Sequence, residues 1–134
     1  MQSQTLTPFK LFSGHNRFVV PLFQRPYVWN REDQWEPLWD DVRAVAERLV
    51  EAPNAGPFAP PNVPPHFLGA IVLEQQPVPA AFIDVRHVID GQQRLTTLQL
   101  LLDAAQLVMQ WHGREQDADA LATLILSRDP PRIC

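Results

Sequence analysis

The sequence has little cysteine, little lysine and no long apolar run, and each shortage narrows the class of protein. The one cysteine among 134 residues, Cys134, has no partner for an internal disulfide. No run of about 18 apolar residues occurs, which argues against a transmembrane helix. The N-terminus also lacks the basic-then-apolar pattern of a secretory signal. Together these shortages predict a cytoplasmic protein with no membrane partner.

Lysine is also scarce, since Lys10 is the only lysine beside ten arginines. The net charge of the chain is −4. Bulk electrostatics therefore do not indicate a nucleic-acid-binding protein. GC-rich coding alone would explain the excess of arginine, so each arginine has to be judged by its position. A guanidinium is a planar fork suited to bidentate contacts with phosphate or carboxylate.

Length and composition predict a single globular domain over residues 1–134, with 46% hydrophobic and 19% charged residues. Six prolines within residues 52–65 predict a loop or polyproline-like excursion. A surface insertion is the favoured interpretation, and a ligand for an aromatic groove is the alternative. Residues 127–134 resemble a loop cut short, so we expect the domain to be truncated at its C-terminus.

The apolar periodicity predicts an α+β fold. Residues 17–20 are a short apolar run that predicts a strand. Residues 67–74 predict a buried strand, and residues 82–89 predict a second strand that pairs with it as a hairpin.

Three helices are expected between and after these strands. Apolar residues recur every three or four positions from Trp35 to Leu49, with Asn30 as the N-cap and acidic residues in the first turn. After Asp90 the period changes to about three and a half, which predicts a helix to Trp111. A weaker helix is expected over residues 115–126.

The turn between the second hairpin strand and the long helix carries the segment Asp90-Gly91-Gln92-Gln93-Arg94. We expect Asp90 at the N-cap, while Gly91 lets a ligand approach the backbone. The first turn of a helix exposes N–H groups and the positive end of the helix dipole. Arg94 would add a charged fork on the same face. The spacing therefore predicts a polyanion site.

A structural interpretation of the same segment stays open. Asp90 and Gln93 also fit a capping box, in which their side chains only satisfy backbone donors. Arg94 could then pair with an acid on a neighbouring helix.

A second cluster lies at Gln24-Arg25-Pro26-Tyr27-Val28-Trp29. An arginine beside aromatic residues is the combination that holds a phosphate and a nucleobase together. The alternative is that Tyr27 and Trp29 fill the core while Arg25 pairs with a carboxylate.

Three segments together resemble the GmrSD-type restriction endonuclease N-terminal domain: FVVPLFQRPYVWNREDQWEPLWDDV, HFLGAIVLEQ and HVIDGQQRLTTLQLLLDA. The match covers roughly residues 8–111 in the family's order and spacing. The resemblance implies a ParB/sulfiredoxin-like fold, a small sheet with packed helices. It also implies an NTP-hydrolysing or NTP-sensing module in prokaryotic defence against phage or modified DNA, commonly fused to an HNH-type nuclease domain.

The resemblance carries functional residues onto this chain. The catalytic candidates are Asp90, Gln93 and Arg94, and the candidates for binding the nucleotide or its phosphate are Gln24, Arg25, Tyr27, Gly91, Gln92 and Arg94. Thr97 is a further binding candidate from its position alone, because it offers a hydroxyl one turn into the helix. The nucleoside triphosphate is the expected substrate, with Mg²⁺ as a possible cofactor. Asp90 would orient the attacking water or the Mg²⁺ ion, and a glutamine would position the nucleophile.

Nuclease chemistry is not expected from these residues. The four histidines His15, His66, His87 and His112 are scattered without metal-ligand spacing, so no metal site is predicted. The alternatives to an NTPase are a DNA-binding module of the same kind of system and an inactive truncated remnant. The nuclease partner is expected outside these residues.

Overall fold

The computed structural model describes residues 2–13, 16–22, 25–52, 62–77 and 83–125. The chain divides into two compact units, and each is described by itself. Unit 1 comprises Met1–Gln24 and Ile71–Cys134, and unit 2 comprises Arg25–Ala70. Predictions for residues 53–61 of the proline-rich loop and for the end at 126–134 lie outside the described residues, as do residues 78–82.

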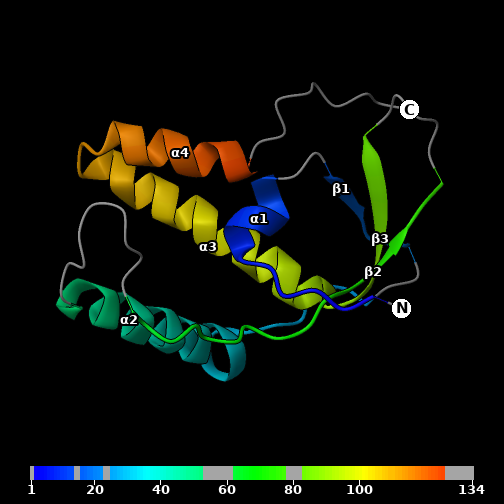
Figure 1. Cartoon of the computed structure of the whole chain (residues 1–134), viewed down its shortest axis with the longest axis horizontal. Coiled ribbons are helices and arrows are strands. Elements are labelled where there is room, and N and C mark those ends of the chain that lie inside the picture. Colours follow the sequence, from blue (N-terminus) through cyan, green and yellow to red (C-terminus); the bar gives the residue numbers. More distant parts are fainter. Residues whose placement is uncertain (1, 14–15, 23–24, 53–61, 78–82, 126–134) are drawn as a thin grey trace. The chain divides into compact units, whose positions relative to one another are not determined.

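Unit 1 contains a three-stranded sheet in the order β1-β3-β2 (Figure 1). The strands are β1 (Asn16–Val19), β2 (Val72–Gln75) and β3 (Asp84–Asp90). The central strand β3 runs antiparallel to β2 and parallel to β1. The predicted hairpin and the early strand are therefore confirmed, and so is the α+β class.

The predicted strand over residues 67–74 is wrong in extent and in burial. β2 begins only at Val72, and Phe67 is 79% exposed. The backbone at Gly69 has φ of +108°, a left-handed conformation that extended strands do not contain. Hydropathy gave no indication of this interruption, because it does not report backbone conformation.

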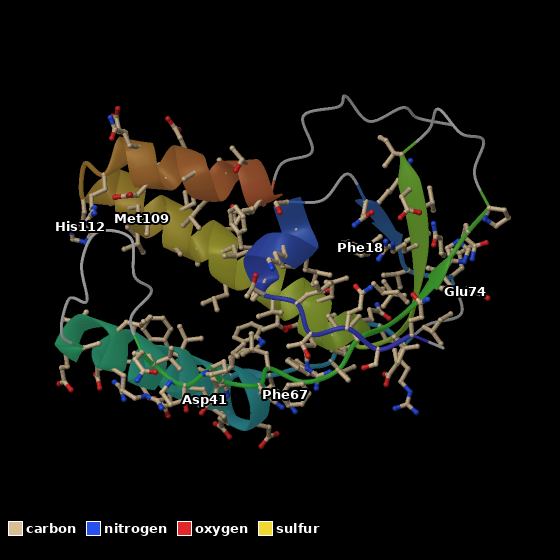
Figure 2. The ribbon with its side chains drawn as sticks, viewed as in Figure 1. Phe18, Asp41, Phe67, Glu74, Met109 and His112 are labelled. Carbon is tan, nitrogen blue, oxygen red and sulfur yellow. The ribbon has the colours of Figure 1, made fainter. Side chains whose placement is uncertain are left out.

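Three helices belong to unit 1: α1 (Pro8–Ser13), α3 (Gln92–Trp111) and α4 (Glu115–Ile125). The two longer helices pack against each other, and Figure 1 shows α4 returning along α3. The turn between them lies just beyond Met109 and His112 (Figure 2) and contains Gly113 at φ of +71°. The predictions of the long helix and the weaker helix are confirmed. The one-and-a-half-turn helix α1 is too short to show a period, and the sequence did not predict it.

The buried apolar side chains among the described residues all lie in unit 1, on β3, α3 and α4. They are Val88, Leu95, Leu98 and Ala118. Val88 stands near the end of β3, while the two leucines stand in the first two turns of α3. The described core is therefore centred on the connection from β3 to α3.

Unit 2 contains a five-residue π-helical turn η1 (Arg31–Trp35) that runs directly into α2 (Glu36–Glu51). The Asn30 Oδ1 atom accepts the N–H of Asp33 at 3.0 Å, as predicted for its cap role. The side chain of Gln34 returns the contact, accepting the Asn30 N–H at 2.9 Å. This reciprocal pair closes the start of the helix.

Pro37 explains why this first turn is wide. A proline ring clashes with the carbonyl group four residues earlier in a regular α-helix and removes a donor. The Trp35 N–H instead bonds the Asn30 carbonyl five residues back, at 3.1 Å. The wider turn relieves the clash, so the proline is tolerated near the start of α2.

We predict that Asn30→Ala destabilises the protein by about 1 kcal/mol, because the start of η1 loses its side-chain acceptor. Urea unfolding followed by circular dichroism measures the change. Asn30→Ser is the matched control, since its hydroxyl still accepts the Asp33 N–H, and it should cost much less. Equal stability of wild type and Asn30→Ala would contradict the cap's contribution.

Candidate functional site

The predicted anion site lies where β3 ends and α3 begins. β3 ends at Asp90, Gly91 adopts φ of +91° and ψ of 16°, and α3 begins at Gln92. The Gly91 carbonyl accepts the N–H of Leu95 at 2.9 Å, which makes Gly91 the N-cap residue. The prediction that Asp90 is the N-cap is therefore wrong by one residue. The chain turns from extended to helical through a left-handed conformation that glycine adopts without steric cost.

The Asp90 carboxylate bends back onto this junction. Its Oδ1 atom accepts the N–H of Gly91 at 2.8 Å. Gly91, the N-cap residue, has no side chain that could cap α3. The exposed Asp90 carboxylate lies at the start of the helix, and the capping box of Asp90 and Gln93 stays a prediction.

This arrangement sets the electrostatics of the junction. The positive end of the α3 dipole favours a carboxylate and a phosphate alike, so the two compete for the same place. A phosphate can take that place in two ways. Either Asp90 rotates away from the Gly91 N–H, or a cation bridges its carboxylate and the phosphate oxygens.

The first turn of α3 carries the remaining predicted residues. Gln92, Gln93 and Arg94 are each partly exposed, so their side chains are reachable from solvent. Thr97 differs, because it is 6% exposed and its hydroxyl donates to the Gln93 carbonyl at 2.7 Å. A phosphate oxygen needs a donor, so Thr97 is the least suited of the predicted binding residues.

Residues 25–29 of the second predicted cluster belong to unit 2. Arg25 is exposed and Tyr27 is partly exposed, both ahead of η1 in a stretch without regular secondary structure. Gln24 lies outside the described residues. Within unit 2 the Trp35 indole Nε1 donates to the Tyr27 hydroxyl at 2.8 Å. Sequence reasoning assigned Trp35 to an apolar stripe and missed this contact, since no periodicity links residues eight positions apart through an irregular segment.

Other parts of the described structure are less suited to binding a metal ion or a phosphate. No group of three histidine, cysteine or acidic side chains suited to a metal occurs among them. A hollow of about 260 Å³ lined by Gln110, Glu115, Ala118 and Asp119 adjoins the opposite end of α3 from Arg94. Its carboxylates would repel a phosphate. In unit 2 the His66 Nε2 atom lies 3.2 Å from a carboxylate oxygen of Asp41 on α2, and both side chains are exposed to solvent.

Helices that could cross a membrane are likewise not found among the described residues. Neither a curated protein nor a solved structure matches the chain. The family model of the GmrSD restriction endonuclease N-terminal domain matches residues 9–133, which include both motifs and nearly the whole chain. The chain therefore belongs to the GmrSD restriction endonuclease N-terminal domain family.

Proposed function

We propose that the chain is a nucleotide-binding, NTP-hydrolysing module of a prokaryotic restriction system that acts on foreign or modified DNA. Family membership supports the restriction role. The observation that supports nucleotide binding is the junction at Gly91, where a left-handed glycine opens a 20-residue helix and Arg94 follows in the first turn. In this proposal the module has a ParB/sulfiredoxin-like fold, acts in the cytoplasm and serves an HNH-type nuclease partner.

The phosphate chain of the nucleotide lies at the N-terminus of α3 in this proposal. Gly91 has no side chain to block the approach, and the first N–H groups of a helix point along its axis toward the ligand. Arg94 contributes a full positive charge, which a chain of net charge −4 needs at a triphosphate site.

Hydrolysis would be electrostatic in origin. Arg94 neutralises charge that develops on the phosphate oxygens as water attacks. Asp90 orients that water or holds Mg²⁺, and releasing the Gly91 N–H frees its carboxylate for this role. Gln93 or Gln92 positions the nucleophile.

Arg25 and Arg94 lie in different units, and a double variant tests whether they act together. If Arg25 and Arg94 act on one nucleotide, the fold-loss of NTP hydrolysis in the double variant will be smaller than the product of the fold-losses in the two single variants. If they act independently, the losses will multiply.

We predict that Arg94→Ala lowers NTP hydrolysis about 100-fold or more, because it removes the charge that stabilises the transition state. Turnover of each of the four NTPs with Mg²⁺ measures the effect. Arg114→Ala is the matched control: Arg114 is an exposed arginine of unit 1 that pairs with Asp117 at 2.7 Å, and its loss should leave turnover unchanged. Unchanged turnover in a folded Arg94→Ala protein would refute the catalytic role.

The same site could instead hold a backbone phosphate of DNA, and salt separates the two ligands. Binding to several DNA phosphates weakens steeply as salt rises. Nucleotide binding at one pocket should change little with salt and should be displaced by free NTP. Steep salt dependence without NTP competition would replace the NTPase proposal with a DNA-binding one.

Gly91→Ala tests the junction itself. Alanine at φ of +91° is strained by about 1–2 kcal/mol, and its methyl group stands where the phosphate is proposed to approach. Gly113→Ala is the matched control, since φ is +71° there and nothing lies within 4 Å of the added methyl group. Urea unfolding should show similar losses of stability in both variants, whereas calorimetric titration should show lost NTP binding only in Gly91→Ala. Equal NTP affinity of the two variants would place the phosphate elsewhere.

A further inference from the structure

The residues Asp90 and Gly91 are the only aspartate–glycine pair in the sequence, and no asparagine precedes a glycine anywhere in it. A glycine has no side chain to shield its backbone nitrogen. That nitrogen can therefore attack the side-chain carboxyl carbon of the residue before it and close a five-membered succinimide ring. In a folded chain, local geometry decides whether the attack takes place.

The geometry at this pair favours the attack. The Gly91 nitrogen lies 2.8 Å from Asp90 Oδ1, so it already stands beside the carboxyl group that it would attack. Among the described residues no backbone carbonyl accepts the Gly91 N–H, so neither the sheet nor the helix holds this nitrogen. The Asp90 side chain is exposed and Gly91 is partly exposed, which gives water access to the pair.

Other aspartates of unit 1 lack this freedom. Asp103 and Asp119 are exposed and each precedes a small residue, an alanine. They lie inside α3 and α4, where the N–H of the next residue is held in a helix hydrogen bond. Gly91 instead stands between the end of β3 and the start of α3, in a left-handed conformation from which a glycine can rotate at little cost.

We propose that Asp90 is a modification site at which the chain converts spontaneously from aspartate to isoaspartate. The Gly91 nitrogen forms a bond to the carbon of the neutral Asp90 carboxyl group, and the hydroxyl leaves with the amide proton as water. A second water then opens the succinimide ring. Opening at the former backbone carbonyl gives isoaspartate, and opening at the former side-chain carbonyl restores aspartate. Water is the only co-reactant, and nothing is oxidised or reduced.

Isoaspartate would change the junction between β3 and α3. The chain then runs through the former side chain, which adds one carbon to the backbone between the two elements. The Gly91 carbonyl accepts the Leu95 N–H at 2.9 Å, and the longer backbone displaces this cap. We expect the modified chain to be less stable and to lose phosphate binding at α3. Only the loss of phosphate binding rests on the proposed function.

The test is to incubate the full folded chain for several weeks at neutral pH, below its melting temperature. Peptide mapping by mass spectrometry with electron-based fragmentation then measures isoaspartate at each aspartate. Isoaspartate should form at Asp90 at least about tenfold faster than at Asp103 and Asp119, whose following N–H groups must first leave a helix hydrogen bond. Asp90→Glu keeps the charge but needs a less favourable six-membered ring, so it should abolish the modification at this position.

The proposal is overturned if the folded chain forms isoaspartate at Asp90 no faster than at Asp103 and Asp119. The same chain unfolded in urea is the positive control, because there Asp90 should react whatever the native geometry is. Saturating NTP with Mg²⁺ separates this proposal from the proposed function. Phosphate bound to the Gly91 N–H should slow the modification. An unchanged rate at Asp90 would support the modification site and contradict the proposed phosphate site.

Discussion

The structure of unit 1 depends on one abrupt change of backbone conformation between β3 and α3. β3 is the central strand and pairs with both other strands, while α3 carries the face against which α4 packs. The link is the single residue Gly91, with φ of +91°. Val88 precedes Gly91 and Leu95 follows it, and both side chains are buried. The turn at Gly91 therefore sets how β3 and α3 pack together in the core. The same turn places the positive end of the α3 dipole at this junction, where phosphate binding is proposed.

Much of this fold is present in the amino-acid sequence as changes of period. The shift from alternation to helical spacing after Asp90 located the β3–α3 junction to within one residue. The parts that failed depend on backbone conformation, which hydropathy does not report. Residues 67–74 are apolar enough for a strand, yet Gly69 adopts a left-handed conformation and β2 is only four residues long. The π turn before Pro37 was equally invisible, because it is a local response to a ring clash and leaves the apolar stripe of α2 intact.

At the candidate site, the sequence predicted the residue types but not their geometry. Residue types at Asp90–Arg94 and at Arg25 and Tyr27 were enough to identify both motifs, and the family match over residues 9–133 includes them. Their geometry was not predictable in the same way: the Asp90 carboxylate accepts the Gly91 N–H, and the Thr97 hydroxyl donates to a carbonyl of its own helix. Tyr27 gains a partner in Trp35 that only the folded unit reveals.

The central claim is that nucleotide phosphate binds at the start of α3, and backbone amide signals test it most directly. Isotope-labelled full-length chain is titrated with Mg²⁺ and each NTP while amide resonances are followed by two-dimensional NMR. We predict that the Gly91 and Gln92 amides shift the most and saturate, since the Gly91 N–H exchanges the Asp90 carboxylate for phosphate. Amides from Gly91 to Arg94 that stay in place at saturating NTP would contradict it.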